Sequence, residues 1–402
     1  MNIHRPMVGV DLTWLRVGKN GGGESYVRNL LDGLCGIQRQ CDYTLFATSS
    51  NISSFAGYAD SGFEIVQCAL DSNHRLSRVL YQNLVLPCKL RKKKVNVAFF
   101  PVYSRPAMRL ALPSVSNVND VQFRIFPRFF PWWKRMLFRV SYRAALALSD
   151  KVVAISESVR TDIVRYYGPS IRGLEGKLVC LYVPVSIETP SGQMRETDRK
   201  TLTPLGLSAG EFVLCVSSLA PHKNLETLLK GFVVYHARHS DRTLVLVGVS
   251  TPDLLANIRR RVHELSLDGA VLLPGFVSNE TRRLLYANAR CVAFPSIYEG
   301  FGMPAVEGLL SRCPVVTSGI PVLREVTGGF ALYVEDYFNP VAWADAMDSV
   351  SALPSSRLTE ACEWATQRYN REVIAAQYDD LFFSLGEPRC LVRDSEVSEE
   401  RR

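Results

Sequence analysis

The sequence predicts an α/β protein in which two Rossmann-like, doubly wound domains face each other across a cleft. Short apolar segments alternate with amphipathic helical patterns along most of the 402 residues. This alternation is typical of parallel sheets covered by helices. A polar stretch at residues 186–204 divides the pattern into two series of similar length. Paired domains of this kind normally bind a ligand in the cleft between them.

The first series begins with a strand, a glycine-rich loop and a helix. Residues 7–10 are apolar, residues 18–23 contain four glycines, and residues 24–34 place apolar side chains on one helical face. This order is typical of a phosphate-binding turn, although a flexible loop that closes an ordinary βα unit explains the glycines equally well. We expect five further strands at residues 43–47, 63–66, 95–100, 114–118 and 151–155. Ser156 then caps a helix.

The second series repeats the alternation. Its expected strands are residues 212–216, 243–247, 271–273, 291–294, 314–317 and 331–334. Its expected helices are residues 224–238, 252–266, 279–289, 304–312 and 340–352. The final pattern, residues 355–384, contains one or two more helices.

These two series predict the domain boundaries. The first domain covers residues 1–188, a linker covers 189–204, and the second domain covers 205–364. We expect the last helix, near residues 365–384, to pack back onto the first domain. Residues 387–402 are polar and charged, which predicts a disordered tail.

Composition and charge exclude several classes of protein. The hydrophobic share of 47% and the charged share of 21% are typical of a soluble globular protein. No apolar run approaches the roughly 18 residues of a membrane span, and no secretory signal opens the chain. The ten cysteines are scattered without a Cys-x-x-Cys pair, which favours free thiols in a reducing cytoplasm over disulfides or a zinc site. The net charge of +8 permits anionic partners.

The clearest chemical signature lies in residues 296–308. Glu299 and Glu307 stand eight positions apart, and Gly300 and Gly302 between them allow a sharp turn and close approach of a ligand to the main chain. The expected helix after this turn directs free amide groups and the positive end of its dipole at an anion. Because carboxylates repel phosphate, we interpret the two acids as hydroxyl ligands, one for a ribose diol and one for a sugar.

A second candidate is Lys223, which follows the first strand of the second series and precedes a helix with an apolar face. A lysine in this place can set a positive charge beside a diphosphate. Taken alone, a solvated surface lysine is the commoner explanation. The loop of residues 296–308 in the same domain favours the interpretation that Lys223 lies beside a diphosphate.

In their context these motifs resemble the retaining glycosyltransferases of family 4, which have the GT-B fold. The resemblance rests on the Glu-x7-Glu signature of residues 295–308 and extends over most of the chain. It also includes the loop of residues 18–23 and the segments 119–120, 154–158, 221–225, 246–248, 274–277, 313–318 and 324–326. It implies that residues 205–364 bind a nucleotide sugar and that residues 1–188 bind the acceptor.

The resemblance implies a role for individual residues. Glu307 would hold the ribose diol of the donor, Glu299 would orient the transferred sugar, and Lys223 would neutralise the departing diphosphate. The implied diphosphate amides belong to Phe301, Gly302 and Met303, the base pocket to Gly275, Phe276 and Val277, and the facing loop of the first domain to Gly22 and Gly23.

The chain departs from the family pattern at two positions. Ser218 stands where the family often has an arginine that shares the diphosphate, so a protonated His222 or backbone amides would have to compensate. Asn119 stands where the family has a histidine that contacts the donor sugar near the reacting carbon. We expect Asn119 to be a catalytic residue, although its amide can form hydrogen bonds but cannot carry charge. The next residue, Asp120, is as readily interpreted as a cap of the following loop as an acceptor contact.

The expected activity is the transfer of a hexose, with retention, from a nucleotide diphosphate sugar to a saccharide or polyprenol-linked acceptor in cell-surface polysaccharide synthesis. Similarity to mannosyl-adding relatives favours GDP-mannose, and UDP-sugars are the alternative. No Asp-x-Asp triplet occurs, so we expect no metal cofactor. A catalytically silent nucleotide-sugar-binding protein and a nucleotide-sugar epimerase are rivals from other classes.

Residues 121–149 contain no acidic side chain, but they interleave six basic residues with phenylalanines and tryptophans. A second basic run lies at residues 91–94. Aromatic and cationic residues together suit an anionic membrane surface, which predicts a peripheral location on the inner face of the cytoplasmic membrane. The alternative is a core helix with solvated arginines. No nucleic-acid-binding module accompanies the basic residues, so we expect no nucleic-acid partner.

Overall fold

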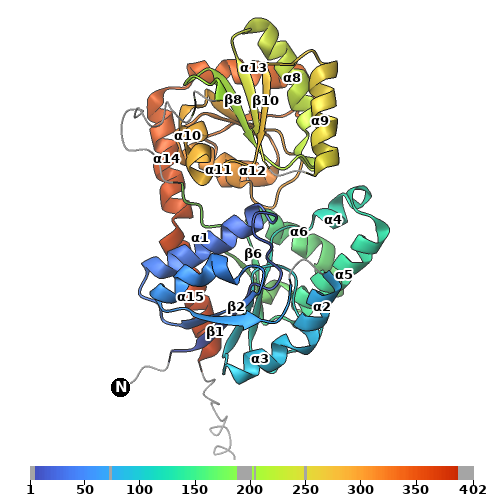
Figure 1. Ribbon diagram of the computed structural model, residues 1–402, viewed down its shortest axis with the longest axis vertical. Coiled ribbons are helices and arrows are strands. Elements are labelled where there is room, and N and C mark those ends of the chain that lie inside the picture. The colour runs from blue at the N-terminus through green and yellow to red at the C-terminus, as the bar shows by residue number, and fades with distance from the viewer. Residues whose placement is uncertain (1–4, 72–74, 188–201, 203–204, 249–250, 388–402) are drawn as a thin grey trace, which may run out of the picture.

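Two parallel sheets lie one above the other in the computed structural model, each covered by helices on both faces (Figure 1). The structure describes residues 5–71, 75–187, 202, 205–248 and 251–387. The lower lobe in Figure 1 holds the first half of the chain and the upper lobe holds most of the second half. The two-domain α/β fold expected from the alternating pattern is therefore confirmed.

The first sheet has seven strands in the order β3-β2-β1-β4-β5-β6-β7, and every pair is parallel. Its strands are β1 (Met7–Asp11), β2 (Asp42–Thr48), β3 (Glu64–Cys68), β4 (Val97–Phe100), β5 (Ser114–Val118), β6 (Lys151–Ala154) and β7 (Leu178–Cys180). The order reverses direction between β1 and β4. The carboxyl ends of these strands carry the loops that face the second domain.

The second sheet has six parallel strands in the order β10-β9-β8-β11-β12-β13. They are β8 (Phe212–Val216), β9 (Thr243–Val247), β10 (Val271–Gly275), β11 (Cys291–Phe294), β12 (Val315–Ser318) and β13 (Leu332–Val334). Here the reversal falls between β8 and β11. The loops that follow these two central strands hold Lys223 and Glu299.

Helices connect the strands in both domains. The first-domain helices are α1 (Gly22–Gly36), α2 (Arg75–Leu84), α3 (Leu86–Lys92), α4 (Gln122–Ile125), α5 (Trp132–Leu148) and α6 (Glu157–Tyr167). The second-domain helices are α8 (Leu225–Arg238), α9 (Pro252–Glu264), α10 (Asn279–Asn288), α11 (Met303–Leu310), α12 (Pro321–Thr327) and α13 (Pro340–Ser349), and α14 (Ser355–Tyr369) and α15 (Arg371–Gly386) end the described chain. None of the described helices is long and apolar enough to cross a membrane.

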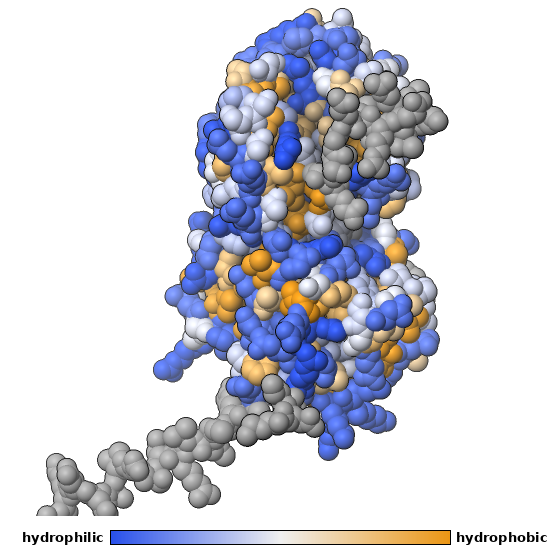
Figure 2. All heavy atoms as spheres, turned by 90° about the vertical axis from the view of Figure 1, so that its left-hand side faces the viewer, coloured by the Kyte–Doolittle hydropathy of each residue, from blue (hydrophilic) through white to orange (hydrophobic). Residues whose placement is uncertain are grey.

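The last two helices run from one lobe to the other along the left side of Figure 1. α14 packs against α11, and α15 packs against α1 on the first domain. The contact is close, because a Cβ atom added to Gly33 would lie 2.3 Å from the carbonyl oxygen of Arg371. The face that carries these helices shows two lobes of mixed hydropathy with a waist between them (Figure 2).

The strands and helices for which residue ranges were expected lie within a few residues of those ranges, and other elements, among them α2, α3 and α4, had no expected range. β7 and α12 were not expected, because three and seven residues are too short to show a clear apolar period. The expected linker at 189–204 falls almost wholly outside the described residues, as does the tail at 387–402 after its first residue. The boundaries drawn there remain predictions.

Candidate functional site

The loop between β11 and α11 lies where the two domains meet. A Cβ atom added to Gly300 would lie 1.8 Å from the carbonyl oxygen of Asn119, so the backbones of the two domains touch at this point. A Cβ atom on Gly22, at the start of α1, would lie 3.8 Å from the Sδ atom of Met303. The structure therefore brings the glycine-rich loop, Asn119 and the segment that begins at Glu299 together where the two domains meet.

The start of α11 has the geometry expected of an anion site. Gly302 has φ of 101° in the left-handed region, and Pro304 occupies the first turn. A side chain at 302 would meet Leu323, since an added Cβ atom would lie 2.5 Å from its Cδ2 atom. Within the described part of the chain, the amide groups of Phe301, Gly302 and Met303 donate no hydrogen bond. These three amides are therefore available to a ligand at the positive end of the helix.

Lys223 and Glu299 form an ion pair inside the second domain. Their side chains are only 13% and 12% exposed, respectively. The Nζ atom of Lys223 also lies 5.3 Å from the centre of the Phe294 ring at the end of β11. The carboxyl ends of β8 and β11 thus bring together the lysine and the acid that the sequence analysis selected, 76 positions apart.

Glu307 lies on α11 and is 2% exposed. Burial raises the pKa of its carboxyl group above the usual range, and the charge of Arg282 and the side chain of Tyr286 offset this in part. A guanidinium nitrogen of Arg282 lies 3.4 Å from the carboxylate. Sequence reasoning missed Arg282, because an arginine in an amphipathic helix gives no signal that distinguishes it from solvated surface.

His222 is a poor replacement for the missing arginine as a cation. Burial, together with the neighbouring Lys223, lowers the pKa of His222 to about 4. The ring is therefore neutral near pH 7 in the ligand-free chain, which favours the backbone amides over a protonated His222 as the expected replacement for the arginine. Its backbone has a structural role, since the amide of Ile297 donates a hydrogen bond of 2.9 Å to the His222 carbonyl oxygen. Ser218, which is among the residues expected to bind the donor, is exposed on the loop after β8, and its role stays a prediction.

Asp120 is a cap in this structure. Its carboxylate accepts a hydrogen bond of 2.9 Å from the amide of Gln122, and burial raises the pKa of Asp120 above its usual value. The Oδ1 atom of Asn119 is buried and has no hydrogen-bond partner among the described residues. An unsatisfied buried acceptor next to the signature loop is the arrangement expected of a ligand contact.

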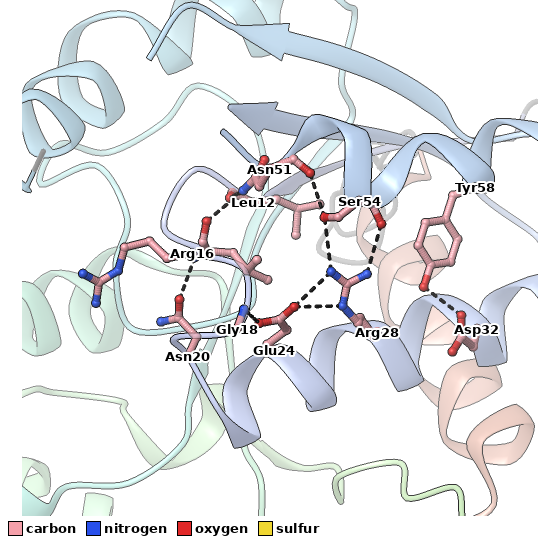
Figure 3. A network of polar contacts seen from close by, with 11 residues as sticks. Leu12, Arg16, Gly18, Asn20, Glu24, Arg28, Asp32, Asn51, Ser54 and Tyr58 are labelled. Atoms are coloured by element: carbon pink, nitrogen blue, oxygen red, sulfur yellow. Dashed lines mark hydrogen bonds and ion pairs between the residues drawn. The ribbon is translucent and has the colours of Figure 1, made fainter. Parts of the chain in front are cut away.

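Side chains of the first domain hold the glycine-rich loop in one shape (Figure 3). Glu24 accepts a hydrogen bond of 2.8 Å from the amide of Gly18, and Asn20 accepts one from the amide of Arg16. Arg28 binds Glu24 on one side and Ser54 on the other, so the helix anchors the loop to the neighbouring segment. Hydrogen bonds thus connect the glycine-rich loop to the start of α1, and its expected phosphate-binding role stays a prediction.

The expected base-pocket residues lie at the end of β10. Gly275 has φ of 73°, and its carbonyl oxygen accepts a hydrogen bond of 3.0 Å from the amide of Gly248. Phe276 is 72% exposed, and Val277 is half-buried against the core. Ser278 then caps α10, the helix that carries Arg282. An exposed aromatic ring beside a left-handed turn is a surface on which a base can stack.

The aromatic side chains of residues 121–149 divide into two groups. Phe123, Phe130 and Phe138 pack inward, as the core-helix interpretation expects. In contrast, the outer face of α5 and the turn before it expose large apolar side chains, namely Phe129, Trp132, Trp133, Met136 and Val140. Arg139 and Arg143 are exposed on the same helix, and the basic run at 91–94 is exposed around the end of α3.

Family models match both halves of the chain. The model described as "Glycosyl transferases group 1" matches residues 204–366. The model described as "Glycosyltransferase Family 4" matches residues 20–173. Together they include Gly22, Asn119, Lys223, Glu299 and Glu307.

Named relatives and solved structures agree with these matches. The chain is 26% identical to the O-antigen chain mannosyltransferase RfbU of Salmonella typhimurium, over 67% of this chain and 68% of that one. It is 27% identical to the O-antigen chain mannosyltransferase B of Escherichia coli, over 60% and 59%. The crystal structure of HepE from Anabaena, in complex with UDP and glucose, superimposes with a TM-score of 0.72 at 18% identity, over 95% of this chain and all of that one.

Proposed function

Because the chain is a glycosyltransferase of the family 4 type with the GT-B fold, we propose that it transfers mannose from GDP-mannose. The proposed acceptor is a saccharide or lipid-linked saccharide of cell-surface polysaccharide synthesis, and the transfer retains the anomeric configuration. The names of the two O-antigen mannosyltransferases support the sugar and the pathway class.

The observation that carries this proposal is the convergence on one loop. The connection from β11 to α11 holds Glu299 and the three free amides, and buried Glu307 follows on α11. Lys223, in the neighbouring connection from β8 to α8, pairs with Glu299. A nucleotide diphosphate sugar presents the matching groups in the same order, namely a sugar, a diphosphate and a ribose. Glu299 and Glu307 would repel a simple phosphate, but they can accept hydrogen bonds from the sugar and ribose hydroxyls.

In the proposed reaction the bond between the anomeric carbon and the diphosphate oxygen breaks, and the electron pair leaves with the diphosphate. Lys223 and the amides of residues 301–303 stabilise the negative charge that develops there. Glu299 orients the sugar, and Glu307 holds the ribose hydroxyls. The acceptor oxygen bonds to the anomeric carbon, and its proton passes to the departing diphosphate oxygen. These groups supply the leaving-group stabilisation without a metal ion.

Two alternatives stay open. A UDP-sugar is the alternative donor, because the HepE structures contain UDP, UDP with glucose, or UDP-glucose. A catalytically silent nucleotide-sugar-binding protein is the other, because Ser218 and Asn119 replace an arginine and a histidine. The ion pair of Lys223 with Glu299 and the buried Glu307 favour an active enzyme.

A panel of nucleotide sugars tests the proposal. We expect GDP-mannose to raise the thermal unfolding temperature more than GDP-glucose, UDP-glucose or UDP-galactose, and to release GDP when an acceptor extract is added. EDTA should leave this rate unchanged. Donor binding without hydrolysis or transfer would establish the silent alternative, and a rate that EDTA abolishes and a divalent ion restores would contradict leaving-group stabilisation by Lys223 and amides alone.

We further propose that the chain binds the anionic inner face of the cytoplasmic membrane through the outer face of α5, defined by Trp132, Met136, Arg139, Val140 and Arg143. Trp132 is 71% exposed, and the apolar members recur at helical spacing with arginines beside them. Such a face can bury apolar side chains at the headgroup boundary while the arginines bind lipid phosphates. This surface would bring a lipid-linked acceptor to the cleft.

A further inference from the structure

The hydroxyl group of Tyr298 links the two domains beside the proposed site. Tyr298 belongs to the second domain and directly precedes Glu299. Its hydroxyl oxygen accepts a hydrogen bond of 3.1 Å from the amide of Val121 and lies 3.4 Å from the Oδ2 atom of Asp162, to which it donates. Both partners belong to the first domain. One oxygen atom thus holds the loop after β5 and helix α6 to the donor-side loop.

The backbone on the other side of Glu299 is held by the same domain. The Oγ atom of Ser156 donates a hydrogen bond of 2.8 Å to the carbonyl oxygen of Gly300. Gly300 also lies against the carbonyl oxygen of Asn119, where no Cβ atom would fit. The residues before and after Glu299 are therefore both fixed by contacts from the acceptor-side domain.

The loop that carries Asn119 is fixed in turn by Tyr298. Val121 is fully buried, so water cannot replace the hydroxyl as the partner of its amide. The carboxylate of Asp120 binds the amide of Gln122 one residue further on. The ring of Phe126 packs edge-on against that of Tyr298, with centroids 5.9 Å apart. The turn that begins at Asn119 is thus held from the side of the second domain.

We propose that Tyr298 is a positioning residue for the transfer reaction, whose hydroxyl fixes the separation between Glu299 on the donor side and Asn119 on the acceptor side. This inference rests on the proposed function, since it uses the roles of those two residues. Transfer requires donor and acceptor atoms to approach within about 3.5 Å, and a misplacement of about 1 Å can reduce the rate about 100-fold. The proposed diphosphate and ribose contacts, at Lys223, the amides at the start of α11 and Glu307, lie in the second domain and do not involve the hydroxyl.

A second polar contact joins the two domains without Tyr298. The carboxylate of Glu325, on α12, accepts hydrogen bonds of 2.6 Å and 2.9 Å from the amides of Glu157 and Ser158, and another from the Ser158 hydroxyl. This cap holds the start of α6 to the second domain without touching Glu299. Glu325 therefore provides a control: its substitution removes a contact between the domains in which Tyr298 takes no part.

Steady-state kinetics of the full chain with its nucleotide-sugar donor and acceptor test the proposal. We expect Tyr298→Phe, which keeps the ring, to lower kcat about tenfold or more while the donor KM stays within about twofold of wild type. Asp162→Asn should lower kcat in the same direction by a smaller factor. Glu325→Gln should lower the unfolding temperature and keep kcat within about twofold.

A Tyr298→Phe variant with wild-type kcat, or one whose donor KM rises as much as kcat falls, would overturn the proposal. An equal loss of kcat in Glu325→Gln would also overturn it, because general loosening of the interface would then suffice. If Tyr298→Phe does not fold, Asp162→Asn tests the proposal instead: wild-type kcat, or a donor KM that rises as much as kcat falls, would overturn it. Failure of the proposed function is distinct, since wild-type protein would then turn over no nucleotide sugar at all.

Discussion

His222 and Lys223 are adjacent in sequence, yet the site uses them differently. The lysine reaches Glu299, whereas the histidine is enclosed beside that cation and its pKa falls to about 4. From the sequence, a histidine next to a lysine and near a missing arginine is a reasonable second cation. Burial lowers the pKa of His222 most and the charge of Lys223 adds to it, and the burial cannot be seen without the fold.

This environment predicts a pH dependence of stability. The pKa of His222 is lower in the folded state than its usual value of 6.5, so between about pH 6.5 and pH 4 only the unfolded chain binds a proton there. Stability is complete above pH 6.5 and is lost as the pH falls toward 4, by at most about 3 kcal/mol from this residue. Urea unfolding of His222→Gln should therefore show a smaller loss of stability across this window than wild type.

The matched control is His263→Gln, because His263 is exposed at the end of α9. This variant should lose as much stability as wild type between about pH 6.5 and pH 4. Equal slopes for wild type and His222→Gln would show that the His222 ring is not buried in its neutral form.

Among the elements, α11 and α5 differ in how much their sequences predict. The glycines and the proline placed the start of α11 correctly, and with it the free amides, because turn and cap residues act locally. The aromatic residues of α5 did not reveal which of them face outward. Which aromatic side chains face inward depends on packing against Tyr103 and Phe123, both of which contact Phe138. Both of these residues lie outside α5 in the sequence.

The exposed face of α5 predicts binding to anionic vesicles. We expect the chain to sediment with phosphatidylglycerol vesicles and not with phosphatidylcholine vesicles, and less so at high salt. The double substitution Arg139→Gln with Arg143→Gln should raise the vesicle dissociation constant about tenfold or more, since each cation near the surface contributes about 1 kcal/mol.

A double substitution of exposed arginines elsewhere, Arg172→Gln with Arg259→Gln, controls for net charge. If both double variants lose vesicle binding equally, charge alone directs the chain to anionic lipid and α5 has no specific role. Equal binding of wild type to both kinds of vesicle would contradict the electrostatic part of the proposal.

For the whole molecule, the sequence predicted the two sheets and the turn at the start of α11, but not the contacts between domains. Periodicity and glycine positions are local signals, and they sufficed for the strands and for the loop of residues 296–308. The partners Tyr298–Asp162, Glu325–Ser158 and Arg282–Glu307 join residues 25 to 167 positions apart. Nothing local marks such pairs, so only the folded chain reveals that the first domain holds the loop of residues 296–308.

The proposed function depends on one assignment, that the loop from Glu299 to Glu307, with Lys223, holds a nucleotide diphosphate sugar. Donor titration and turnover of Glu307→Ala and Lys223→Ala, beside Glu360→Ala and Lys230→Ala as exposed controls, test it directly. We predict that Glu307→Ala raises the donor dissociation constant roughly 10- to 100-fold, because charged hydrogen bonds to hydroxyls contribute about 1.5 to 3 kcal/mol. Lys223→Ala should lower kcat about 100-fold with a smaller change in affinity. Wild-type donor affinity and wild-type turnover in both variants would contradict the assigned site.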